Sequence, residues 1–179
     1  MQVTQVRWTA SGGWDRPASR TAGRPADLVL VFGARDILTE GTCVEDVRRE
    51  HPGARIFGCS TAGEIRGTEV TDDSVVSTAI SFSTSSIQAA VRHVASAAES
   101  SAAGAALAAA LDPRGLVHVF VLSDGMLVNG SDLVRGLAGR LPAGVSITGG
   151  LSGDGVRFER TVVVCEGEAR SNAVAAIGL

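Results

Sequence analysis

Three short polar segments carry the side chains that could do chemistry. They are Gly58-Cys59-Ser60-Thr61-Ala62-Gly63-Glu64, the stretch from Ser123 to Asp132, and a segment with four glycines from Gly149 to Gly155. Each directly follows a predicted strand, and in α/β folds ligands bind beyond the carboxyl ends of strands. The candidate ligand-binding residues are Cys59, Ser60, Thr61, Gly63, Glu64, Asp124, Asn129, Gly149, Gly150, Gly153 and Asp154.

The first segment invites two catalytic hypotheses. It resembles the G-x-S-x-G elbow of serine hydrolases, but its second glycine falls one residue late, and His93 and His118 lie in predicted strands without an evident triad partner. Cys59 is the stronger candidate, because backbone N–H groups in a turn can lower the pKa of a thiol. The competing interpretation, which we favour, is a small buried residue at the end of a strand.

The second segment combines a possible ligand site with a helix start. Asn129 or Ser131 would cap the following helix, and Asp132 would complement its dipole. Capping explains Asp124 poorly, so Asp124 remains a candidate for ligand binding. Asn129 is a candidate for either role.

The third segment fails the dinucleotide fingerprint, because its glycines do not follow the G-x-G-x-x-G spacing and no helix pattern follows. Its backbone amides could form a nest for a carboxylate or phosphate. The alternative is a flexible turn between two strands.

Missing residue types exclude several classes of chemistry. All 16 basic residues are arginine and there is no tyrosine, which excludes a phosphate-loop lysine, a Schiff-base lysine and a tyrosine acid. The three histidines are too scattered for a metal site, so we expect neither a metal nor a cofactor. A net charge of -3 disfavours nucleic acid and anionic membranes as partners, and no window is apolar enough for a membrane span.

Three cysteines at wide spacing, without C-x-x-C and without a signal peptide, predict reduced thiols in a cytoplasmic protein.

Hydrophobic periodicity predicts an α/β fold, a mixed β-sheet with flanking helices in a single layered domain over residues 1–179. The segment from Ser11 to Pro25 is expected to be a surface connection. Strands are predicted over 2–9, 27–32, 55–59, 116–122 and 145–148. Helices are predicted over 42–50, 95–111 and 131–141. We also expect an antiparallel pair of strands over 74–82 and 87–94, and a closing hairpin over 158–165 and 172–177.

Four segments together resemble the N-terminal domain of the FIST family, and the resemblance covers nearly the whole chain. They are DLVLVFGARD (27–36), ARIFGCSTAGEI (54–65), VHVFVLSDGMLVNGSDLVRGL (117–137) and ITGGLSGDGVRFERT (147–161). The resemblance implies a sensory input module of signal-transduction proteins, found in bacteria among others, that binds small ligands such as amino acids. It carries no catalytic residues.

Two departures from longer relatives matter for the site. Those relatives place a helix between the first two strands, where this chain has a short segment broken by Pro17, Gly23 and Pro25. They also carry a C-terminal partner domain, FIST C, which we expect to be absent from this chain.

The leading hypothesis is therefore a non-catalytic, cytoplasmic sensory domain that binds a small molecule. Asp124 would accept a ligand ammonium while amides of residues 149–155 hold its carboxylate, as an amino acid requires. The alternatives are a module that docks a signalling partner protein, and a thiol enzyme or redox sensor that uses Cys59.

Overall fold

The computed structural model describes residues 1–15 and 24–179, so the middle of the expected connection from Ser11 to Pro25 lies outside the described residues. The strands form two main sheets and a small hairpin. The seven-stranded sheet has the order β12-β11-β4-β3-β7-β1-β2, and the four-stranded sheet has the order β10-β9-β13-β8. Each is mixed, because β3 and β4 pair in parallel, as do β9 and β10, whereas the other pairs are antiparallel. The predicted fold class, α/β with mixed strand pairing and flanking helices, is confirmed, although the structure has two mixed sheets where the sequence predicted one.

The strands of the seven-stranded sheet are β1 (Gln2–Thr9), β2 (Gly13–Trp14), β3 (Leu28–Gly33), β4 (Arg55–Ser60), β7 (Ser74–Ser81), β11 (Val163–Cys165) and β12 (Glu168–Arg170). Those of the four-stranded sheet are β8 (Gln88–His93), β9 (His118–Ser123), β10 (Ser146–Leu151) and β13 (Ala173–Gly178). The hairpin consists of β5 (Glu64–Arg66) and β6 (Glu69–Thr71). The helices are α1 (Arg35–Glu40), α2 (Thr42–Glu50), the 3-10 turn η1 (Ala97–Glu99), α3 (Ser100–Ala110) and α4 (Gly130–Ala138).

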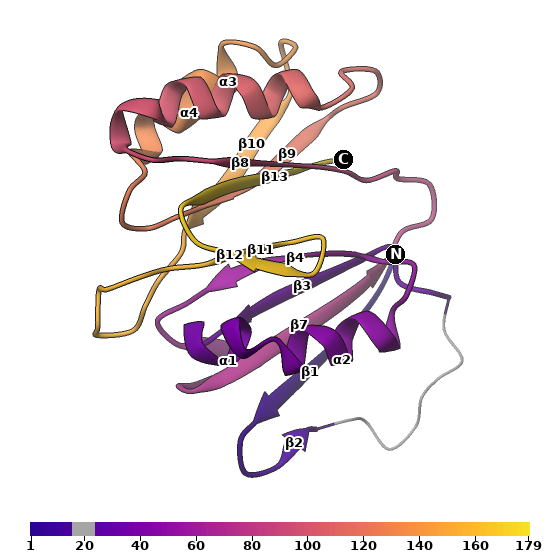
Figure 1. Cartoon of the computed structure of the whole chain (residues 1–179). Coiled ribbons are helices and arrows are strands. Elements are labelled where there is room, and N and C mark those ends of the chain that lie inside the picture. The colour runs from indigo at the N-terminus through magenta and orange to yellow at the C-terminus, as the bar shows by residue number, and fades with distance from the viewer. Residues whose placement is uncertain (16–23) are drawn as a thin grey trace.

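The two sheets pack face to face, with a pair of helices on each outer side (Figure 1). Side chains that alternate between the two faces of β9 explain this packing. Val119 and Val121 face α3 and α4, whereas Phe120 and Leu122 face the seven-stranded sheet. There Phe120 meets Phe57 of β4 edge-on, with ring centroids 5.7 Å apart. Side chains on both faces of β9 are therefore packed against other layers, which explains the continuous apolar run of this strand.

Two predicted strand pairings are wrong. β7 and β8 lie in different sheets, because the chain crosses between the sheets over residues 82–87. Likewise β11 pairs with β4 and β12, whereas β13 pairs with β8 and β9. The actual hairpin joins β11 to β12 through Glu166 and Gly167, both with positive φ, as a tight two-residue turn requires.

The predicted glycine-rich loop also begins differently. β10 continues through Gly149 and Gly150 to Leu151, so these residues are strand residues. The other predicted boundaries agree with the structure to within three residues, with α2 matching at both ends, whereas α3 and β11 each begin five residues later than predicted. No helix among the described residues is long and apolar enough to cross a membrane.

Helices α3 and α4 approach closely through glycines. A Cβ atom on Gly136 would lie 2.0 Å from the carbonyl oxygen of Ser101, and one on Gly104 would lie 2.2 Å from that of Leu133. These backbones are in contact, which sets how closely α3 and α4 lie together.

We predict that Gly136→Ala lowers the free energy of unfolding by roughly 1–3 kcal/mol, because the helices must separate to admit the methyl group. Urea denaturation measures this change. The matched control is Gly130→Ala in the same helix, where the nearest atom to a new Cβ is 3.7 Å away. Equal stabilities of the two variants would contradict the close helix contact.

Candidate functional site

The ends of β4, β9 and β10 meet where the two sheets join, which brings the three predicted polar segments together. The backbone N–H of Gly153 donates to the carbonyl of Ser60 at 2.8 Å, and that of Ser152 donates to the carbonyl of Ser123 at 2.8 Å. We call these four residues the strand-end junction. Gly153 also lies against the backbone of the segment after β4, where a Cβ would come within 3.0 Å of the nitrogen of Ala62.

Asp124 is buried beside the junction and its carboxylate already holds three donors. Oδ1 accepts from the backbone N–H groups of Met126 and Leu127, at 2.8 and 2.7 Å. Oδ2 accepts from the Thr161 hydroxyl at 2.8 Å, and that hydroxyl accepts from the N–H of Gly125. Asp124 thus fixes the turn after β9.

Glu64 is likewise buried and fully hydrogen-bonded. Its carboxylate accepts from the hydroxyls of Thr61 and Ser74, each at 2.6 Å. The Ser60 hydroxyl accepts from the backbone N–H of Val162 at 3.0 Å. The polar side chains after β4 therefore fasten this segment to β7 and to the chain that enters β11.

Asp154 forms a buried ion pair with Arg35, whose Nη1 lies 3.0 Å from Oδ2. The same oxygen accepts from the backbone N–H groups of Glu159 and Arg160, and Arg157 lies 3.3 Å from Oδ1. Burial raises the pKa of Asp154, but the two N–H groups and the two guanidinium groups outweigh burial and hold this pKa below the usual value. The segment after β10 thus folds around the ionised carboxylate of Asp154.

Cys59 lies in the interface between the sheets and is buried. Desolvation raises the pKa of its thiol to about 11, although a hydrogen bond with Ser152 acts in the opposite direction. Burial also raises the pKa of Cys43 to about 12 and that of Cys165 to about 11. All three are free thiols, and at neutral pH they are protonated.

Of the remaining predicted residues, three are required by the local structure, and the fourth has no close neighbour. Asn129 caps α4, because its side chain accepts from the N–H of Asp132. Gly63 has a φ of 130°, which favours glycine. A Cβ on Gly149 would lie 1.8 Å from a carbonyl oxygen of β9, whereas one on Gly150 would meet nothing within 4 Å.

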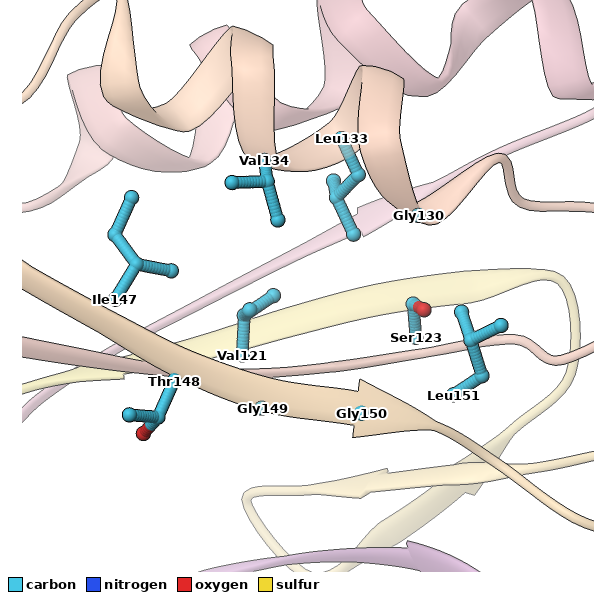
Figure 2. Close-up of a pocket in the computed structure, with 10 residues that line it drawn as sticks. All are labelled: Val121, Ser123, Gly130, Leu133, Val134, Ile147, Thr148, Gly149, Gly150 and Leu151. Atoms are coloured by element: carbon cyan, nitrogen blue, oxygen red, sulfur yellow. The ribbon is translucent and has the colours of Figure 1, made fainter.

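A groove of about 500 Å³ lies between α4 and strands β9 and β10 (Figure 2). The side chains on its walls are mostly aliphatic. It is lined by Val121, Ser123, Gly130, Leu133, Val134, Ile147, Thr148, Gly149, Gly150 and Leu151. Its volume and its composition are those of a small-molecule site, in which apolar walls hold a few polar groups. Of the predicted residues, only Gly149 and Gly150 line it.

Ser123 is the polar feature of this groove. It is 1% exposed, and its hydroxyl has no hydrogen-bond partner within the described part of the chain. Figure 2 shows this side chain on the groove side of β9, below the start of α4 at Gly130. The sequence analysis missed Ser123, although alternation along β9 places it on the same face as Val119 and Val121.

Across residues 1–15 and 24–179, no group of three or more His, Cys, Asp or Glu side chains is placed to hold a metal ion. The buried carboxylates near the junction, those of Asp124, Glu64 and Asp154, meet hydroxyls, backbone N–H groups and arginines.

We predict that the native protein resists iodoacetamide at neutral pH, because its three thiols are buried and protonated. Labelling followed by mass spectrometry should give complete modification in urea and almost none in buffer. Rapid labelling of Cys59 in the folded protein would contradict this prediction and restore the thiol hypothesis.

We predict that Asp154→Asn lowers the free energy of unfolding by about 3 kcal/mol at pH 7, because Arg35 loses its buried partner. Since the folded pKa of Asp154 is lowered, this stabilisation is present above the unfolded pKa of about 3.9 and disappears as the pH falls through the folded value. Urea denaturation from pH 7 to pH 3 should show wild type and variant converging only at the acid end. The control Glu168→Gln removes an exposed partner of Arg170 and should change little.

Comparison with known proteins supports one assignment. The FIST N domain model matches residues 27–179, from the start of β3 to the end of the chain. No curated protein and no solved structure gives a match. The match covers most of the chain, including every strand of the four-stranded sheet and the groove. The chain therefore belongs to the FIST family, whose domains are sensory modules of signal-transduction proteins.

Proposed function

We propose that this domain senses a small organic molecule that binds in the groove between α4 and strands β9 and β10. The observation that carries the proposal is the Ser123 hydroxyl, which is buried on the groove wall without a partner among the described residues. A buried polar group without a hydrogen bond costs free energy, and a ligand that supplies the bond removes this cost. No other described polar side chain on the groove wall is in this position.

The walls favour a ligand with a branched aliphatic body. Leu133 and Val134 come from α4, and Ile147 and Leu151 come from β10. Such a body would replace water along both walls. The groove volume accommodates a molecule the size of a large amino acid side chain and its backbone.

The polar end of the ligand would lie between Ser123 and the start of α4. The first amides of a helix have no partner within the helix, and its N-terminus carries partial positive charge. Gly130 is the first residue of α4 and lines the groove. A carboxylate there would accept from these amides and from the Ser123 hydroxyl, so we favour a carboxylic acid, amino acids included.

This placement differs from the one expected from the sequence. Asp124 would have to give up bonds to Met126, Leu127 or Thr161 to bind an ammonium group. Gly149 and Gly150 remain part of the proposed site as residues of the groove wall. The absence of a reactive thiolate and of a metal cluster among the described residues is compatible with binding without catalysis, and the free thiols suit a reducing compartment such as the cytoplasm.

Three probes with related skeletons test the proposal by thermal shift. Leucine carries both charged groups, 4-methylpentanoate lacks the ammonium group, and 3-methylbutylamine lacks the carboxylate. We expect leucine and 4-methylpentanoate to raise the melting temperature and the amine to leave it unchanged. At about 100 times its dissociation constant a ligand adds roughly 2.7 kcal/mol, which corresponds to about 5–10 °C here.

Ser123→Ala should affect the protein differently with and without ligand. Without ligand we expect a stability that is unchanged or higher by about 1 kcal/mol, because the substitution removes an unpartnered buried hydroxyl. With ligand we expect the thermal shift to be lost. The matched control is Ser146→Ala at the exposed start of β10, which should keep the shift. An undiminished shift in Ser123→Ala would overturn the proposed site.

A further inference from the structure

Strand β10 leaves one side of the four-stranded sheet open. It pairs only with β9 among the described strands, and five of its six residues are exposed. Ser146 and Ser152 donate backbone N–H groups toward β9, at 3.1 and 2.8 Å. Because these groups alternate along a strand, the N–H and C=O groups of Ile147, Gly149 and Leu151 point to the open edge.

This edge lacks the charges that usually protect an exposed strand. Its sequence, Ser-Ile-Thr-Gly-Gly-Leu, has no charged residue and no proline. At the opposite edge of the same sheet β8 carries Arg92 and His93, and in the seven-stranded sheet β12 carries Glu168 and Arg170. The contrast indicates that β10 has a partner strand.

The glycines of β10 add a second indication. Nothing within 4 Å would obstruct a Cβ on Gly150, so the internal packing does not require glycine there. A glycine inside a strand weakens it, and one use of such a residue is to let another backbone approach closely. Gly150 is adjacent to Gly149, so the middle of β10 has no side chains.

We propose that the partner is a second copy of this chain, with the two β10 strands pairing antiparallel about a two-fold axis at Gly149. In this register Gly149 faces its own symmetry mate, and Ile147 of each copy lies opposite Leu151 of the other. The hydrogen bonds between the copies would be made by the outward-pointing N–H and C=O groups of Ile147, Gly149 and Leu151. The strand is thus complementary to itself in both hydrogen bonding and side chains, as an isologous contact requires.

The pairing also changes the groove. Ile147 and Leu151 line it, and Leu151 is 53% exposed at its open side, as is Val134 at 44%. In the dimer, Leu151 of the second copy packs beside Ile147 and covers apolar surface along the groove's mouth. Each copy therefore contributes a residue to the site of the other, and the two four-stranded sheets join into one.

The test uses the protein without any ligand, so its outcome is independent of the proposed function. Sedimentation equilibrium over a concentration series should show the mean mass rising from 18.3 kDa toward twice that value. Leu151→Lys places a charge at the paired edge and should keep the protein monomeric at every concentration. The matched control, Val70→Lys on the exposed face of the β5–β6 hairpin, should dimerise like the wild type.

Amide hydrogen exchange gives a readout that does not depend on a variant. The N–H groups of Ile147, Gly149 and Leu151 should exchange quickly in dilute protein and more slowly as concentration increases. Those of Thr148 and Gly150, which face β9, should be protected throughout. A mass of 18.3 kDa at all concentrations, or fast exchange at Gly149 in a dimeric sample, would overturn the proposal.

Discussion

The structure depends on how the segment after β10 closes the space between two sheets. Ser152 bonds to the end of β9 in one sheet, and the next residue, Gly153, bonds to the end of β4 in the other. Asp154 then binds Arg35 at the start of α1, which lies on the far side of the seven-stranded sheet. Three consecutive residues thus connect both sheets and an outer helix, and this connection fixes where β10 ends relative to β9 and β4.

That constraint explains why the carboxylates of the three segments already have hydrogen-bond or ion-pair partners within the protein. Asp124, Glu64 and Asp154 are buried, and a buried carboxylate is tolerable only when donors surround it. In each case the donors are hydroxyls, backbone N–H groups or an arginine from a neighbouring segment. The free hydroxyl of Ser123 lies on the opposite face of β9, toward α4, where no such closure is needed.

Local patterns predicted the elements well, because the periods of apolar residues and the capping residues act over a few positions. α2 and β1 are examples, with boundaries as expected. Strand pairing failed for β7 with β8 because strands that are neighbours in sequence can enter different sheets, and that choice depends on packing between distant segments rather than on adjacent residues. The sequence predicted that the polar segments lie at strand ends, but it could not show which of their side chains already have hydrogen-bond partners, because those partners come from distant segments. Ser123 looks unremarkable beside Asp124 until its face of β9 is known.

The position of β10 links the two proposals physically. A ligand that binds the groove contacts β10 through Ile147, Gly149 and Leu151, and the same three residues present the open edge. Any ligand that prefers one arrangement of this edge must shift the monomer–dimer equilibrium, and by reciprocity the dimer must bind that ligand with altered affinity. Because the end of β10 is held at the junction by Ser152 and Gly153, a displacement of the strand cannot be absorbed there and must occur toward α4 or the open edge. Such a coupling would let ligand occupancy control association, and both proposals place their contacts on β10.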